Sequence, residues 1–181
     1  MTYDVAIIGA GIIGSSIARE LSRYKLNVCL LEKANDVATG TSKANSGIVH
    51  GGYDPEPGTL MAKLNVQGAS LFKTWASELH IDYKNTGSLV VAFSESDMAH
   101  VKKLYERGKL NGVPGLEILN QQQLLELEPN INPETQGALL CTSASIISPY
   151  QATWAIAENA VENGVKVFLE TTVHEIESES I

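Results

Sequence analysis

The sequence is poor in cysteine, and its two cysteines, Cys29 and Cys141, form no metal-ligand pattern. Cys29 lies in the apolar run Val28–Leu31, so we expect an inert core residue and a reducing compartment. The histidines are scattered and give no zinc-site spacing. No Ser-His-Asp or Cys-His arrangement supports a hydrolase. We therefore expect no metal site.

Long apolar runs and basic runs are also missing. No apolar stretch reaches the roughly 18 residues that a membrane-spanning helix needs, and the first apolar run begins so near Met1 that it leaves no room for a signal peptide. The formal net charge is −8, and Lys102-Lys103 is the densest basic patch, so nucleic acid is not an expected partner. We expect a cytoplasmic protein, with peripheral membrane contact left open.

The composition that remains is that of a globular protein. Hydrophobic residues make up 44% and charged residues 19% of the 181 positions. This length fits one domain, or one domain with part of a neighbour. It is long enough to bury about 70% of the surface of the unfolded chain.

Three glycines, Gly9, Gly11 and Gly14, form the most informative pattern. They follow a strand-like run over residues 3–8 and open an amphipathic helix over residues 12–24. In a dinucleotide site the first glycine permits a tight turn, the second lets backbone approach a pyrophosphate, and the third allows close packing of helix on sheet. The helix N-terminus also offers unpaired N–H groups to the phosphates.

Glu32 closes a second strand-like run over residues 27–32. An acid at this place is suited to accept hydrogen bonds from ribose hydroxyls, which favours an unphosphorylated ribose. The alternative is an ordinary exposed acid at a strand end. Together with the glycines, the pattern predicts a dinucleotide-binding β-α-β unit.

A loop over residues 36–47 follows, rich in glycine, serine, threonine and asparagine. An NAD-type unit would usually continue with a helix and a third strand. This loop instead presents many N–H groups and hydroxyls, which suit a pyrophosphate-linked ligand and an isoalloxazine ring. FAD is therefore favoured over NAD, with a flexible surface linker as the alternative.

Further elements are predicted from caps and periodicity. After Thr59 we expect a long helix with one apolar face, made of Leu60, Leu64, Leu71, Phe72, Trp75 and Leu79. Ser94 with Asp97, Asn120, and Ser148 with Pro149 are expected to begin three more helices. Strands are expected over residues 87–93, 137–141, 145–147, 165–169 and 172–176.

This order predicts an α/β fold: an incomplete Rossmann-like FAD-binding domain with the start of a β-rich substrate domain inserted. Residues 1–79 and 146–181 are assigned to the first domain and residues 80–145 to the second. The strand over residues 3–8 is expected at the centre of the sheet, beside residues 28–32.

The chain resembles the D-amino-acid-oxidase-type FAD-dependent oxidoreductases over nearly all its length, most closely the glycerol-3-phosphate dehydrogenase branch. The residues that carry the resemblance are Gly9–Gly14, Glu32-Lys33, Gly40–Gly52, Pro57–Leu64, Leu127–Pro129 and Ser148-Pro149. L-2-hydroxyglutarate oxidases share a very similar segment around Asn45–His50.

The resemblance implies FAD as cofactor, with the adenine contacted by the backbone at the position of Val173. The implied FAD-binding residues are Gly9, Gly11, Ile12, Ile13, Gly14, Glu32, Lys33, Thr41, Ser42, Asn45, Ser46, Gly47, Ile48 and Val173. A later Gly-Asp segment that completes the flavin site in this family is absent. We therefore expect an N-terminal part that alone is inactive, binds FAD poorly and pairs with another chain through exposed sheet edges.

The implied reaction is hydride transfer to flavin from a carbon that bears a hydroxyl group. His50 is the candidate catalytic residue, as a base, a flavin attachment point or a lining residue; the alternative is a histidine satisfied by backbone near Gly51-Gly52. Lys63 and Arg107 are weighed as anion ligands against a solvated helix face, and Tyr53 as a substrate contact against packing.

The expected substrate is a small hydroxy acid or phosphate ester, with glycerol 3-phosphate oxidised to dihydroxyacetone phosphate and the electron acceptor left open. The alternatives are an L-2-hydroxyglutarate or amino-acid oxidase on the same scaffold, and a non-catalytic nucleotide-binding module.

Overall fold

The computed structural model describes residues 2–177, which group into two compact units. The first unit contains residues 2–47, 76–82 and 148–177, and the second contains residues 48–75 and 83–147. This division differs from the expected domains at residues 48–75 and 146–147, which group with the second unit, and at residues 80–82, which group with the first. The expected boundaries stay a prediction for the whole protein.

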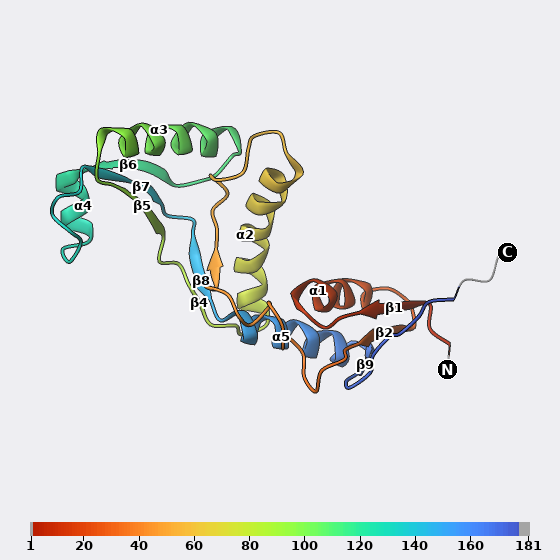
Figure 1. The fold of residues 1–181 in the computed structure, drawn as a ribbon. Helices are drawn as coiled ribbons and strands as arrows, with labels where there is room; N and C mark the ends of the chain where they lie inside the picture. Colours follow the sequence, from red (N-terminus) through yellow and green to blue (C-terminus); the bar gives the residue numbers. More distant parts are fainter. Residues whose placement is uncertain (1, 178–181) are drawn as a thin grey trace. The chain divides into compact units, whose positions relative to one another are not determined.

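The first unit is built on a three-stranded parallel sheet in the order β1-β2-β9 (Figure 1). The strands are β1 (Val5–Ile8), β2 (Val28–Leu31) and β9 (Lys166–Phe168). The first and last segments of the chain therefore share one sheet, as expected, and β1 pairs with β2. The central position is nevertheless taken by β2, so the expectation that residues 3–8 form the central strand is wrong for the described sheet.

The strand expected over residues 172–176 is also wrong, because the described chain is irregular from Thr171 to Glu177. Glu170 has a positive φ of 50°, and its N–H donates to the Ala34 carbonyl at 2.9 Å. These features turn the chain out of the sheet after β9. No strand within residues 2–177 pairs with this segment.

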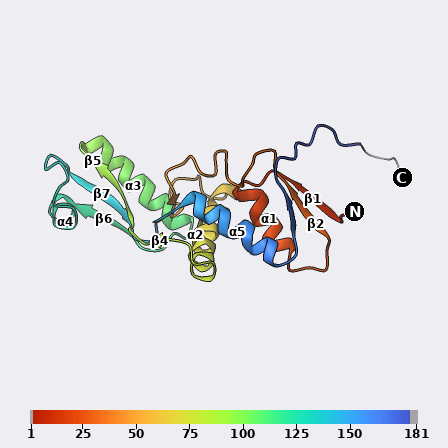
Figure 2. The same ribbon diagram turned by 90° about the horizontal axis from the view of Figure 1, so that it is seen from below.

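Helices α1 (Ile12–Leu21) and α5 (Pro149–Glu162) lie side by side in this unit (Figure 2). Their buried residues are mostly small, including Gly14, Ser15 and Ala18 of α1 and several alanines of α5. Small side chains let helix backbones approach closely. The apolar spacing read in α1 does not mark its buried face, since Ile13 is 74% and Ile17 46% exposed.

The second unit contains an antiparallel sheet in the order β5-β7-β6, with α3 along one face (Figure 1). Its elements are β5 (Ser88–Ala92), α3 (Glu95–Leu110), β6 (Leu116–Asn120), α4 (Gln121–Leu127) and β7 (Gly137–Cys141). Strand β6 has no counterpart in the expected elements. It pairs with β7 along its whole length, which supplies its hydrogen-bond partners.

A second, smaller antiparallel sheet of this unit joins β3 (Ile48–Val49), β8 (Ser145–Ile147) and β4 (Tyr83–Lys84). Its strands come from three distant parts of the chain, so the segment that leads to His50 is tied to β8.

Helix α2 (Leu60–Glu78) begins after Thr59, whose hydroxyl accepts the Ala62 N–H at 3.2 Å, as expected. Its expected apolar face is largely not buried: Leu60, Leu64 and Leu71 are exposed, whereas Trp75 is buried. None of the helices between residues 2 and 177 is long and apolar enough to cross a membrane.

The predicted helix caps are confirmed. The Ser94 hydroxyl accepts the Asp97 N–H at 3.2 Å, and Asn120 forms a reciprocal capping box with Gln123. Ser148 caps α5, with Pro149 in its first turn. These local hydrogen bonds involve residues a few positions apart, which is why the sequence alone identifies them.

Candidate dinucleotide-binding site

The turn between β1 and α1 is built from glycine backbone. Gly9 has a φ of +97°, a conformation that side chains rarely allow, and its N–H donates to the Leu31 carbonyl at 2.7 Å. A Cβ at Gly14 would overlap the Gly9 carbonyl oxygen, so α1 approaches the turn as closely as a glycine permits. A Cβ at Gly11 would lie 3.0 Å from Ser42 Oγ.

The loop over residues 36–47 folds back onto this turn. Ser42 Oγ accepts the Ile12 N–H at 2.9 Å, and the Ala38 N–H donates to the Ala10 carbonyl at 3.0 Å. Asn45 closes the loop on itself, because its Oδ1 accepts the Gly47 N–H at 2.9 Å. These bonds argue against the reading of the loop as a flexible linker.

Turn and loop together line an open cavity of about 500 Å³ in the first unit. Its lining includes Gly9, Gly11, Ile12, Ile13, Gly14, Thr41, Ser42 and Asn45, all predicted from the sequence. Sequence reasoning missed three further lining residues, Ile7, Ile8 and Ile17. Ile17 lies four residues after Ile13, a spacing that was interpreted as the buried face of an amphipathic helix. Both side chains are instead exposed and form an apolar wall of the cavity.

Glu32 is buried, which rules out the alternative of an exposed strand-end acid. Its Oε2 accepts the Ala10 N–H at 2.7 Å and its Oε1 accepts the Ala34 N–H at 2.9 Å. The carboxylate therefore ties the glycine turn to the end of β2. Each oxygen keeps a second lone pair with which it can accept a ribose hydroxyl.

The other predicted FAD-binding residues lie apart from the cavity lining. Lys33 is exposed after β2, and Ser46 and Gly47 follow Asn45 at the end of the loop. Val173 is half-buried in the irregular segment after β9. Ile48 belongs to β3 in the second unit.

His50 is exposed in the second unit, where it lines a hollow of about 220 Å³ with Gly52, Tyr53, Asp54, Pro55, Met61 and Asn65. Tyr53 is buried, and its hydroxyl lies 3.4 Å from Ser88 Oγ. Burial is the main cause that raises the pKa of the Tyr53 phenol, and the charges of Asp54 and Cys141 add to it, against the Ser88 hydrogen bond. Tyr53 thus stays protonated near neutral pH and packs in the core.

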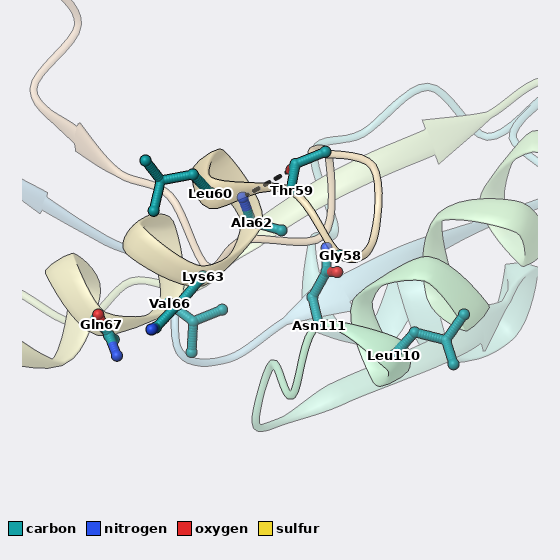
Figure 3. Close-up of a pocket in the computed structure, with 9 residues that line it drawn as sticks. All are labelled: Gly58, Thr59, Leu60, Ala62, Lys63, Val66, Gln67, Leu110 and Asn111. Carbon is teal, nitrogen blue, oxygen red and sulfur yellow. Dashed lines mark hydrogen bonds between the residues drawn. The ribbon is translucent and has the colours of Figure 1, made fainter.

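The two candidate anion ligands differ in their surroundings. Arg107 donates from Nη1 to the Asp54 carbonyl at 2.6 Å and from Nη2 to the Glu56 carboxylate. Lys63 is exposed on the first turn of α2, beside a hollow of about 630 Å³ that Thr59 and Asn111 also line (Figure 3). Among residues 2–177, no cluster of His, Cys, Asp or Glu side chains is arranged to hold a metal ion.

The first-unit residues fit a bound dinucleotide. Gly9 has a positive φ, and Gly11 and Gly14 carry no side chains, so backbone faces the cavity. The first turn of α1 also lines the cavity, and the N-terminus of a helix is suited to bind phosphate. The lining residues Thr41 and Ser42 supply hydroxyl groups. Glu32 is not part of the lining, but its carboxylate is bonded to the Ala10 N–H of the same turn.

Known proteins match the chain along nearly all of its length. Residues 4–180 match the family model described as FAD dependent oxidoreductase. Glycerol 3-phosphate dehydrogenase of Caloramator mitchellensis is 54% identical over 97% of this chain and 36% of its own length. Glycerol 3-phosphate oxidase of Mycoplasma genitalium is 40% identical over 99% of this chain and 47% of its own length.

A solved structure has the same fold. The dithionite-reduced L-α-glycerophosphate oxidase of Mycoplasma pneumoniae with FAD bound superposes with a TM-score of 0.88 and 35% identity, over 94% of this chain and 45% of its own. The expected α/β class is therefore confirmed. The chain spans between about a third and a half of the length of these relatives.

Proposed function

Because the chain belongs to the family of FAD-dependent oxidoreductases, we propose that it holds the ADP part of FAD within a longer enzyme that oxidises glycerol 3-phosphate to dihydroxyacetone phosphate. The observation that carries the cofactor assignment is the open cavity of about 500 Å³ lined by the glycine turn and the Ser42 loop. The substrate assignment is supported by the 54% identity to a glycerol 3-phosphate dehydrogenase.

The pyrophosphate would be held by the backbone around Gly11 and Ile13 at the start of α1, with the Thr41 and Ser42 hydroxyls as further partners. The ribose hydroxyls would donate to Glu32, whose carboxylate is already oriented by two backbone N–H groups. The remaining predicted contacts are Lys33, Asn45, Ser46, Gly47 and Ile48, with the Val173 backbone toward adenine.

Bound FAD would supply the hydride acceptor for the substrate carbon. This chain would contribute a general base: an imidazole nitrogen of His50 would accept the hydroxyl proton of the substrate. Tyr53 beside it stays neutral because of its burial, so it adds no negative charge to the hollow that His50 lines.

The test is a substrate comparison with the full-length protein that contains this chain. Glycerol 3-phosphate, L-2-hydroxyglutarate and glycine are supplied separately with an artificial electron acceptor, and reduction of the acceptor is followed. We expect turnover with glycerol 3-phosphate only. Turnover with another substrate instead would reassign the enzyme, and flavin-free, inactive protein would favour the nucleotide-binding module.

The electron acceptor is resolved by the same preparation. Hydrogen peroxide formed in air-saturated buffer indicates an oxidase, whereas reduction of a soluble quinone without peroxide indicates a dehydrogenase. The 181-residue chain alone is expected to be inactive and to bind FAD weakly. Flavin fluorescence during titration with FAD measures that affinity.

A further inference from the structure

The last turn of α3 binds the segment Gly52–Glu56 through side-chain donors. Asn111 Nδ2 donates to the Gly52 carbonyl at 2.9 Å and to the Pro55 carbonyl at 2.8 Å. Arg107 donates to the Asp54 carbonyl at 2.6 Å and pairs with the Glu56 carboxylate. Two side chains at the end of α3 thus bond to three carbonyl groups and one carboxylate of a segment that has no regular secondary structure of its own.

Close packing adds to these bonds. Gly108, between the two donors on α3, is buried, and a Cβ there would lie 2.9 Å from Tyr53 Cβ. Tyr53 therefore packs directly on the backbone of α3. Its hydroxyl reaches Ser88 on β5, which gives the segment a further contact in the same unit.

The opposite side of the segment is confined by α2. Gly52 has a φ of +108°, and a Cβ there would lie 2.7 Å from Val66 Cγ2 and 3.2 Å from Asn65 Oδ1. Figure 3 shows Asn111 extending from the end of α3 toward Gly58, just before the first turn of α2. The segment is therefore held between two helices and has little freedom to shift.

We propose that Arg107 and Asn111 are positioning residues that fix the segment Gly52–Glu56 and, through it, the place of His50 in the hollow shared with Tyr53 and Asn65. This inference rests on the proposed function, in which His50 accepts the substrate proton. It also replaces the hypothesis that Arg107 binds the substrate anion, because both ends of its guanidinium are already engaged and its side chain is 15% exposed.

The chemistry of the two donors determines the variants. In Asn111→Asp the side chain keeps its size but loses both N–H groups, so the Gly52 and Pro55 carbonyls would face a carboxylate. Arg107→Ala removes both interactions of the guanidinium. Arg107→Lys keeps the charge near Glu56 but cannot donate in the same two directions. Lys109→Ala is the matched control, since Lys109 lies on the same helix and its ammonium pairs with Glu106 at 3.8 Å.

The first measurement is steady-state kinetics on the full-length protein with bound FAD. We expect kcat to fall about 10- to 100-fold in Arg107→Ala and Asn111→Asp, the scale of a misplaced catalytic group, with KM little changed. Arg107→Lys should recover part of the loss, and Lys109→Ala should resemble wild type. A rise in KM with unchanged kcat in Arg107→Ala would identify a substrate ligand and overturn the proposal.

The second measurement does not depend on the substrate. Amide hydrogen exchange of peptides that cover residues 50–58 should quicken about 10-fold in Arg107→Ala and Asn111→Asp, and remain unchanged in Lys109→Ala. Unchanged exchange in both variants would overturn the positioning role. Faster exchange in an enzyme that does not oxidise glycerol 3-phosphate would support it, while contradicting the proposed function alone.

Discussion

The β1–α1 turn and the segment Gly52–Glu56 are both irregular, and both contain a glycine with no room for a side chain. In the turn, a Cβ at Gly14 would overlap the Gly9 carbonyl. In the segment, Gly52 is similarly confined, but the chain is also held by the guanidinium of Arg107 and the amide of Asn111. Exclusion of side chains leaves a glycine pattern in the sequence, whereas donors on a distant helix leave none.

The largest effect is expected at Gly14, where the turn has no room. Gly14→Ala should lower the free energy of unfolding by about 3 kcal/mol or more, because backbone rather than a flexible side chain opposes the new Cβ. Urea denaturation followed by circular dichroism measures this change.

Gly68→Ala is the control for Gly14→Ala, since Gly68 lies within α2 and a Cβ there would meet nothing within 4 Å. It should be stabilising by about 0.5–1 kcal/mol, the helix preference of alanine over glycine. Equal stabilities of the two variants would contradict the close approach of α1 to the turn.

At Gly11 a glycine is needed for the approach of the ligand more than for the packing of the fold. A Cβ at Gly11 would have Ser42 Oγ, a side-chain atom, at 3.0 Å and no backbone within 4 Å, so Gly11→Val should lower the free energy of unfolding by less than Gly14→Ala. It would instead block the approach of a pyrophosphate, and FAD content should fall about 10-fold or more. Flavin absorbance per protein after purification tests this, and full occupancy would refute the site.

Glu32 is a buried side chain that holds the turn, alongside Ser42. Glu32→Ala leaves the Ala10 and Ala34 N–H groups without their acceptor, which should cost about 1–3 kcal/mol of stability and weaken FAD binding. Glu20→Ala, at an exposed residue of α1, should stay within about 0.5 kcal/mol of wild type. Both variants are compared by their denaturation midpoints and their flavin content, and both values should be lower in Glu32→Ala than in Glu20→Ala. Equal values in the two variants would argue against the role of Glu32.

The smallest effect concerns Tyr53, and it depends on pH. The folded protein resists its ionisation because burial raises the phenol pKa above the ordinary value, so above about pH 10 the unfolded chain releases this proton more readily. The contribution of Tyr53 to the free energy of unfolding is therefore fully present below about pH 10 and is lost as the pH rises further. Tyr53→Phe should make the decline shallower, whereas Tyr24→Phe, at an exposed tyrosine, should not. Urea midpoints between pH 8 and 11 report the slopes.

Sequence reasoning succeeded where the structural requirement is local. The tight turn was predicted from Gly9 and Gly14, which lie five positions apart and pack against each other. The helix caps were predicted from Ser94 and Asn120, each of which bonds to a residue three positions later. Glu32 was singled out because a strand end and a glycine turn have a known separation in this kind of unit. Its carboxylate is bonded to the turn, and its contact with a ribose stays a prediction.

The failures came from partners far away in sequence. Arg107 and Asn111 act on residues 51 to 59 positions earlier, which no local pattern reveals. Strand β6 is paired with β7 along its length, whereas residues 172–176 are irregular and no strand in the described part of the chain pairs with them. Ile13 and Ile17 have helical spacing, but a neighbouring helix with small residues selects Gly14 and Ala18 for burial instead.

The sheet order of the first unit has a consequence for the sequence of events in folding. Cys29 of β2 pairs with Lys166 of β9, so the intervening chain must emerge from the ribosome before this sheet can close. The sheet β5-β7-β6 has all its strands between Ser88 and Cys141, and it can form earlier during synthesis. The first unit therefore contains the earliest strands, β1 and β2, but its sheet is completed after the sheet β5-β7-β6. Until β9 is synthesised, one edge of β2 is unpaired.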